Sequence, residues 1–237
     1  MKGFAAAQEA LAKQQEQMAA NRPNTTFRFR IKPGEDARVV FISSSPQLVA
    51  REHTVPGVRG GYDNVICLDE SGENPEACPF CREGNLAPVV AYFTVLHLTE
   101  FETRSGHTVV NPVRTLAAKS ATITILQKYA EKQGDKGLTG MVFDVSRSNK
   151  RTSPNVGDVW MYDETISKAE IMELNPEAKP LDFDEEVIRY TFEQMESHVA
   201  KVNVGRDSRS DNRGSGDAPR RQRDEDNDTS TSSDIDW

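Results

Sequence analysis

The sequence predicts a mainly β protein with some helix, because short segments of alternating apolar and polar residues outnumber segments of helical period. The clearest is 26–32, where Phe27, Phe29 and Ile31 alternate with basic residues, the period-two pattern of a half-buried strand. Further strands are expected over residues 38–43, 89–99, 141–146 and 158–162, and a helix over residues 118–133 that Gly134 ends.

The two ends of the chain differ in composition from this middle part. Residues 1–22 are rich in Ala, Gln, Glu and Lys, and Phe4, Leu11 and Met18 recur every seven residues, which predicts an N-terminal helical arm. Residues 184–202 carry apolar residues at helical spacing and predict a helix that packs back on the core. Residues 204–237 contain very few apolar residues and predict a disordered acidic tail, because such a segment cannot offset the entropy of ordering.

Several short strands with one helix between them fit a small Greek-key barrel of the OB-fold type. We therefore expect an arm over residues 1–22, a core over residues 23–203 and a tail over residues 204–237. No segment approaches the run of about 20 apolar residues that a membrane span needs, so we expect a soluble, intracellular protein. Paired carboxylates, a Ser/His/Asp set and a glycine-rich phosphate loop are not recognisable, so we do not expect an enzyme.

The cysteines are the sharpest chemical signal. There are three, an odd number, and they all lie between Cys67 and Cys81, which favours a local metal or redox site over a disulfide framework. Cys78 and Cys81 form a Cys-x-x-Cys turn, Cys67 precedes Cys78 by eleven positions, and His53 precedes Cys67 by fourteen. Four such ligands fill a tetrahedral site and predict one structural Zn2+, which holds a subdomain of residues 50–86 inserted into the barrel.

Other interpretations of this cluster remain open. Cys-Pro-Phe-Cys is nearly identical to a glutaredoxin-type dithiol, but that motif follows the first strand of a βαβ unit, whereas here an acidic loop precedes it. The cysteines could also be buried and without a ligand. His97 and His107 could replace His53 as the fourth ligand, but a strand interior and a Ser-Gly-His turn are ordinary structural settings for histidine.

The net charge of −8 is unevenly distributed. Residues 224–237 hold six acidic residues and no basic one, whereas residues 104–151 hold nine basic residues against three acidic ones. A site for single-stranded nucleic acid needs cations for the phosphates and exposed rings to stack on the bases. The sequence interleaves the two: Arg28 and Arg30 alternate with phenylalanines, Tyr62 follows Arg59, Tyr92 adjoins the cysteine-rich loop, and Tyr162 follows the basic turn 147–151. Each ring could instead fill the core.

In chain order, the Ala/Gln-rich arm, the strand 27–31, the ligands His53, Cys67, Cys78 and Cys81, the strand after them and the acidic tail resemble one known family. It is the helix-destabilising single-stranded DNA-binding proteins of T-even-like phages, which are zinc-containing OB-folds, and the resemblance covers most of the chain. The resemblance implies a DNA cleft between the zinc subdomain and the barrel, lined by Tyr62, Tyr92, Arg114, Lys119, Arg147, Lys150 and Arg151.

The resemblance also implies a function. It is to coat single-stranded DNA without sequence preference during phage DNA replication, recombination and repair, in the cytoplasm of the infected bacterium. Members of the family bind along DNA cooperatively through a basic cluster in the N-terminal arm, but residues 2–20 of this chain contain only Lys2 and Lys13 as basic residues. Binding of the protein to itself through the arm is therefore an open expectation.

The last residues of the chain, Asp234, Ile235, Asp236 and Trp237, resemble the acidic, aromatic-ended tips with which other single-strand binders engage replication proteins. We expect partners such as a polymerase, a helicase or a primase, because an aromatic anchor amid negative charge fits a basic, apolar pocket. The alternative is a tail that only confers solubility. Two alternative functions for the whole chain also stand: a zinc-containing module that docks proteins or binds duplex DNA or RNA, and a Cys-Pro-Phe-Cys redox protein.

Overall fold

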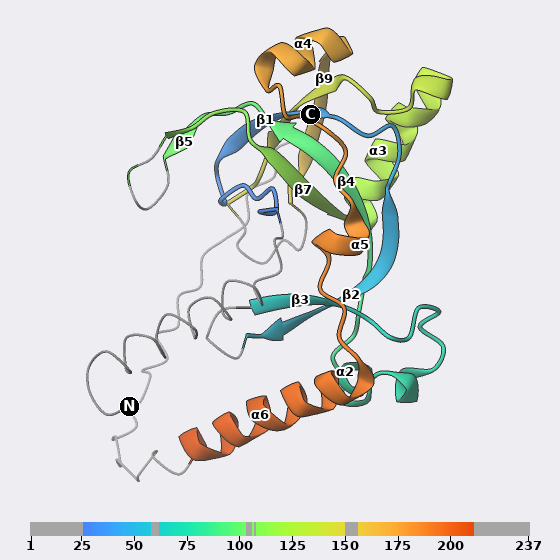
Figure 1. Cartoon of the computed structure of the whole chain (residues 1–237), viewed down its shortest axis with the longest axis vertical. Helices are drawn as coiled ribbons and strands as arrows, with labels where there is room; N and C mark the ends of the chain where they lie inside the picture. The colour runs from blue at the N-terminus through green and yellow to red at the C-terminus, as the bar shows by residue number, and fades with distance from the viewer. Residues whose placement is uncertain (1–25, 58–61, 103–105, 107, 150–155, 211–237) are drawn as a thin grey trace, which may run out of the picture.

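The computed structural model describes residues 26–57, 62–102, 106, 108–149 and 156–210, and its dominant element is an antiparallel β sheet accompanied by a few helices (Figure 1). The large sheet contains β1 (Asp36–Phe41), β2 (Leu48–Pro56), β3 (Tyr62–Ile66), β4 (Val89–His97), β7 (Val113–Lys119), β8 (Met141–Ser146) and β9 (Val159–Thr165). A separate small hairpin pairs β5 (Phe101–Glu102) with β6 (Thr108–Val109). The prediction of a mainly β protein is confirmed.

Strand β4 organises the large sheet. On one edge it pairs with β2 at its first half and with β1 at its second half, and on its other edge it pairs with β7 along its whole length. β1 pairs in turn with β8, and β8 with β9. The β4 sequence VVAYFTVLH is rich in β-branched and aromatic residues, which favour a strand that is buried on both faces.

The main lobe, which we define as β1, β4, β7, β8, β9 and α3 (Ser120–Gln133), surrounds the largest apolar core. Phe41 lies at its centre, with ring centroids 5.5 Å from those of both Phe93 and Phe143 in edge-to-face geometry. Leu126 of α3 packs against the same core. The predicted helix is confirmed, and Gly134 follows it with a positive φ of 61°, a conformation that glycine adopts without strain.

The small lobe lies beyond the end of this sheet and consists of the β2–β3 pair from residue 52 onward, residues 67–87 and α6 (Phe192–Ser210). β2 joins the lobes, because residues 48–51 pair with β4 and residues 52–56 pair with β3. A 3-10 turn, η1 (Pro75–Ala77), and the short helix α2 (Pro79–Arg82) complete the lobe, and α6 runs below it in Figure 1.

Two expectations about secondary structure need correction. Residues 26–32 do not form a regular strand: the segment is extended and makes one parallel bridge to β7, between Arg28 and Thr115, although Phe29 and Ile31 are buried as the alternation predicts. The single helix expected over residues 184–202 is two helices, α5 (Phe183–Glu186) and α6. Between them Ile188 forms a parallel bridge with Val65, and α6 packs on the small lobe instead of the main core.

The C-terminal part of the chain contains one helix that was not predicted and another that extends beyond the predicted boundary. Helix α4 (Lys168–Leu174) is not among the predicted elements, although Ser167 and Glu170 form a capping box at its start. Helix α6 continues to Ser210, past the core boundary expected at residue 203. The arm 1–22 and the end of the tail from residue 211 lie outside the described residues. No helix in the described part of the chain is both long enough and apolar enough to span a membrane.

Candidate functional site

His53, Cys67, Cys78 and Cys81 meet in the small lobe. Their ligand atoms all lie within 4.8 Å of one another, and the first three side chains are buried while Cys81 is partly buried. His53 Nε2 lies 3.3 Å from Cys78 Sγ and 3.6 Å from Cys81 Sγ, and the sulfurs of Cys67 and Cys81 are 3.5 Å apart. All three cysteines are free. The group can therefore hold a metal ion.

Local structure brings these four residues together. His53 lies in β2 opposite Val65 of β3, and Cys67 directly follows β3, so the β2–β3 pair carries two of the four side chains. Cys78 is the N-cap of α2 with extended backbone, and Pro79 occupies the first turn, where a missing N–H costs nothing. His53 Nδ1 lies 3.4 Å from Asn85 Oδ1, which directs Nε2 toward the sulfurs.

Burial and hydrogen bonds shift the pKa values of these four side chains in different directions. Burial lowers the pKa of His53, which keeps the imidazole neutral as a ligand must be. Burial opposes ionisation of Cys78, but hydrogen bonds from the backbone of Cys81, Leu68 and Phe80 outweigh it and lower the pKa of that thiol. Burial raises the pKa of Cys67 and of Cys81. A bound cation would favour the thiolate form of both.

Helix α6 closes the small lobe over this group. Met195 is fully buried, and its Sδ lies 3.7 Å from Cys78 Sγ. His198 Nε2 lies 2.8 Å from the carbonyl oxygen of Pro56, and the His198 ring contacts Phe80. The metal-binding candidate is therefore part of the core that holds α6 in place.

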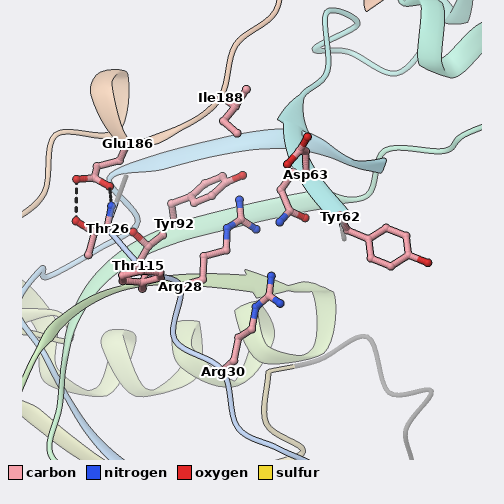
Figure 2. Close-up of a pocket in the computed structure, with 11 residues that line it drawn as sticks. Thr26, Arg28, Arg30, Tyr62, Asp63, Tyr92, Thr115, Glu186 and Ile188 are labelled. Atoms are coloured by element: carbon pink, nitrogen blue, oxygen red, sulfur yellow. Dashed lines mark hydrogen bonds between the residues drawn. The ribbon is translucent and has the colours of Figure 1, made fainter. Parts of the chain in front are cut away.

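A cleft of about 440 Å3 lies between the two lobes (Figure 2). Its walls are the extended segment 26–30, the start of β3 and the connection from α5 to α6, and β4 and β7 form its floor. The lining residues are Thr26, Phe27, Arg28, Arg30, Tyr62, Asp63, Asn64, Tyr92, Thr115, Glu186 and Ile188. The cleft thus contains residues from segments that are far apart in the sequence.

A buried network fixes the floor of the cleft. Arg28 Nη1 donates to Glu52 Oε1 at 3.0 Å, a second guanidinium nitrogen pairs with Oε2, and the Tyr92 hydroxyl donates to the same carboxylate. Burial opposes the charge of Arg28, but the Glu52 carboxylate outweighs burial and raises the pKa of Arg28. Burial, assisted by Glu52, raises the pKa of Tyr92. Glu52 thus compensates the charge of Arg28 and holds its side chain over the Tyr92 ring.

Exposed groups form the rim of the cleft. The Phe27 and Tyr62 side chains are 78% and 73% exposed, and the Tyr62 ring projects outward from β3 in Figure 2. The exposed Arg30 side chain extends beside Arg28. At the opposite wall Glu186 accepts hydrogen bonds from the backbone N–H and hydroxyl of Thr26. The rim therefore combines accessible rings with a cation.

The structure brings together four of the residues predicted to bind nucleic acid: Arg28, Arg30, Tyr62 and Tyr92. The expectation that Tyr92 stacks on a base needs correction, because its ring is fully buried and its hydroxyl is committed to Glu52. The sequence offered no signal for Glu52, which binds Arg28 and Tyr92 beneath the cleft, or for Glu186, which lines the cleft, because both roles depend on contacts between distant segments. Phe27 was recognisable from its alternation with Arg28.

The remaining predicted residues are more dispersed. Arg114 of β7 contacts Phe27 at the edge of the cleft, while Lys119 lies at the far end of β7. Arg147 Nη1 donates to the carbonyl of Ile31 at 2.7 Å, and Tyr162 of β9 packs near Tyr129 of α3, so neither lines the cleft. The other predicted contacts lie outside the described residues: Arg59, Lys150, Arg151, Asp234, Ile235, Asp236 and Trp237.

The protein is therefore mainly β, with a candidate metal centre and a cleft whose lining includes three aromatic rings, two arginines and two acidic residues. No model of a known protein family matches the chain, and no curated protein matches its sequence significantly. The functional argument therefore depends on the residues of the site.

Proposed function

We propose that the chain is a non-catalytic single-stranded DNA-binding protein with an OB-fold barrel and a structural zinc site. The observation that carries this proposal is the cleft, where the exposed rings of Phe27 and Tyr62 accompany the exposed Arg30. Rings provide a sequence-tolerant stacking surface, since every base has a π face, and a cation such as Arg30 attracts the phosphates. This arrangement suits an unpaired strand better than a duplex, whose bases are already stacked.

The strand pairings support the OB-fold. Taken in chain order, β1, β4, β7, α3, β8 and β9 give three strands, a helix and two strands, with β1 paired to both β4 and β8. A five-stranded, partly open Greek-key barrel has this organisation. The main core lies inside these strands, and the small lobe contributes none of its buried residues.

The geometry of the His53 group supports zinc as the metal. Zn–S bonds of about 2.3 Å and Zn–N bonds of about 2.0–2.1 Å in a tetrahedron give S···S separations of about 3.8 Å and S···N separations of about 3.6 Å. Three of the six separations in the protein lie close to these values, 3.5 Å between the sulfurs of Cys67 and Cys81 and 3.3 and 3.6 Å from His53 nitrogen to sulfur, and all six are within 4.8 Å. Three thiolates and one imidazole leave no open position, which favours a structural ion.

In the proposed function, the zinc ion would stabilise the wall of the cleft that contains Tyr62. His53 lies within β2 and Cys67 directly follows β3, the strand that begins at Tyr62. When bound, zinc ties this pair to α2 and so fixes one wall of the cleft. DNA affinity should therefore depend on the metal although the metal does not touch the strand.

The biological setting follows from the resemblance to the T-even-like phage proteins. We propose a role in phage DNA replication, recombination and repair, in the cytoplasm of the bacterial host, with a polymerase, helicase or primase as partners of residues 234–237. Support for these partners is the acidic, aromatic-ended sequence of the tail.

The proposal is tested by titrating fluorescent oligo-dT with the zinc-loaded full chain over a series of salt concentrations. We expect tight binding that weakens by a log–log slope of about −0.7 per neutralised phosphate. Phe27→Ala and Tyr62→Ala should each reduce affinity about tenfold or more, since stacking contributes about 1–3 kcal/mol per base. Leu86→Ala, an equally exposed side chain outside the cleft, is the control.

Competition experiments separate the alternatives. Displacement of oligo-dT by duplex DNA or RNA at equal concentration would favour the duplex- or RNA-binding alternative, and no binding even at low salt would leave a protein-docking zinc module. Rapid reaction of Cys78 and Cys81 with a thiol reagent in the native, zinc-loaded protein would support the redox alternative.

A further inference from the structure

Arg114 lies between two aromatic rings at the edge of the cleft. Its guanidinium carbon is 5.5 Å from the centroid of Phe27 and 5.4 Å from that of Phe101. The three residues come from separate segments: the extended segment 26–31, the hairpin β5–β6 and strand β7. The main-chain hydrogen bond from Thr115 N–H to the carbonyl of Phe27 fixes two of these segments side by side.

Arg114 has no carboxylate partner among the side chains that the structure describes, whereas Arg28 and Arg38 both have carboxylate partners. Burial lowers the pKa of Arg114, and it still remains a cation at neutral pH. Arg114 is thus a half-buried cation beside two rings, and without an ion pair in the described part of the chain it is available for an anionic ligand.

The base of this arrangement is rigid. Phe101 stacks on His97, with ring centroids 5.3 Å apart and an interplanar angle of 23°, and His97 makes an edge contact with Phe29 of the main core. Phe27, in contrast, leaves most of its ring in solvent. The exposed ring of Phe27 therefore lies beside Arg114, whose other neighbouring ring, Phe101, stacks on His97.

We propose, building on the proposed function, that Phe27, Arg114 and Phe101 form a second nucleotide subsite, outside the cleft proper. A base stacks on the exposed face of Phe27, and the neighbouring phosphate is bound by Arg114. The strand then runs from Tyr62, across Phe27, toward the β5–β6 hairpin. Phe27 is the link, because it lines the cleft and also contacts Arg114.

The substitution of Arg114 by lysine tests this subsite, because the two side chains have the same charge but different shapes. A guanidinium is planar and stacks on rings, whereas the ammonium of lysine has the same charge without the plane. Arg114→Lys therefore keeps the electrostatic attraction and removes the stacked arrangement. Arg82→Lys is the matched control, because Arg82 also lies over a ring, that of Phe192 at 5.8 Å, but on the outside of the small lobe.

The experiment measures the affinity of the zinc-loaded full chain for oligo-dT of increasing length, from about 4 to about 16 nucleotides. Arg114→Lys and Phe101→Ala should leave binding of the shortest oligomers unchanged and reduce affinity for the longer ones about tenfold. The salt dependence of Arg114→Lys should equal that of the wild type. Arg82→Lys should bind like the wild type at every length. Unchanged thermal unfolding of each variant shows that the main lobe is intact.

Each other outcome overturns the subsite. Equal affinity of wild type and variants at all lengths would show that the strand does not reach Arg114, while an equal loss at all lengths would assign Arg114 a structural role in the cleft. Both results leave the proposed function standing. Absence of binding by the wild type would overturn the proposed function itself, and the subsite with it.

Discussion

The two lobes hold their cores by different means. In the described residues, the main lobe buries sixteen apolar residues in one cluster, of which five are aromatic, and Phe41 makes edge-to-face contacts with Phe93 and Phe143. The small lobe buries seven, of which Cys67 and Cys78 are two, and His53 is buried among them. The first core consists of apolar side chains, whereas the second places candidate metal ligands where a core normally has aliphatic side chains. We therefore expect the two lobes to differ in how far their stability depends on a metal.

Metal removal should have the largest effect. Structural zinc contributes about 10 kcal/mol or more to the folding of small zinc modules, so Cys78→Ser or a strong chelator should unfold the small lobe. The main lobe should remain folded, because its core contains no ligand. Amide hydrogen exchange measures both lobes at once: we expect protection to be lost in β3 and α6 and kept in β4 and β7.

The control for this experiment is Glu70→Gln, an exposed position in the same loop as the ligands. It should bind zinc and keep full protection. If the Cys78→Ser variant lost amide protection equally in both lobes, the two lobes would form one cooperative folding unit. This result would contradict the expectation that the main lobe stays folded without the metal.

Phe41→Ala tests the opposite lobe. Phe41 is fully buried against Phe93, Phe143 and Trp160, and truncation of such a ring costs about 3–5 kcal/mol. Urea unfolding followed by tryptophan fluorescence should show this loss, while zinc content measured by metal analysis should stay at one ion per chain. A variant that loses zinc together with stability would indicate that the small lobe depends on the main one.

The main lobe should also respond to pH through His97. Burial, with a smaller effect of Arg114, lowers the pKa of His97 to about 4. In the unfolded chain the pKa is about 6.5, so the unfolded state takes up a proton first as the pH falls, and stability is lost between about pH 6.5 and pH 4. We expect wild type to lose about 2 kcal/mol of unfolding free energy between pH 7.5 and pH 5.

The variant that isolates this effect is His97→Leu, which removes the titrating group at similar volume. Its main lobe should be nearly insensitive over the same pH interval, measured by the fluorescence of buried Trp160 in a Trp237→Phe background. An equal pH dependence in both proteins would assign the loss to other groups.

The sequence predicted the local features of both lobes and missed what depends on distant partners. Cys78 and Cys81 belong to a short turn, and burial of Phe29 follows from alternation within a few residues. The burial of Tyr92 did not follow, because a tyrosine hydroxyl favours a wet edge unless a buried acceptor exists. That acceptor, Glu52, lies forty residues earlier in the chain and reaches Tyr92 only through the β2–β4 pairing.

The C-terminal helix is a second case in which the sequence predicted a local feature but not its distant partner. Spacing predicted that Ile188, Phe192, Met195 and Val199 form a buried face. Ile188, Met195 and Val199 do pack in the small lobe, whereas the Phe192 ring lies outside that cluster beneath the guanidinium of Arg82. The helical period predicts that one face of the C-terminal helix is buried, but it does not identify the residues that bury it. We therefore expected this face to pack on the main core. Ile188 also takes a sheet position beside Val65, which ends the helical pattern before α6 begins.

The smallest effect should come from the ion pair between Arg82 of α2 and Glu196 of α6, whose nitrogen and oxygen lie 2.9 Å apart on the surface. Both side chains are more than 40% exposed, and water and salt screen such pairs. Glu196→Gln should therefore change amide protection in α6 by about twofold at most, and less in high salt. If α6 instead lost most of its protection, surface charge and not the packing of Met195 beside the metal ligands would hold the helix. In that case the stability of the small lobe would depend on a surface ion pair more than on its buried core, contrary to the difference that we infer between the two lobes.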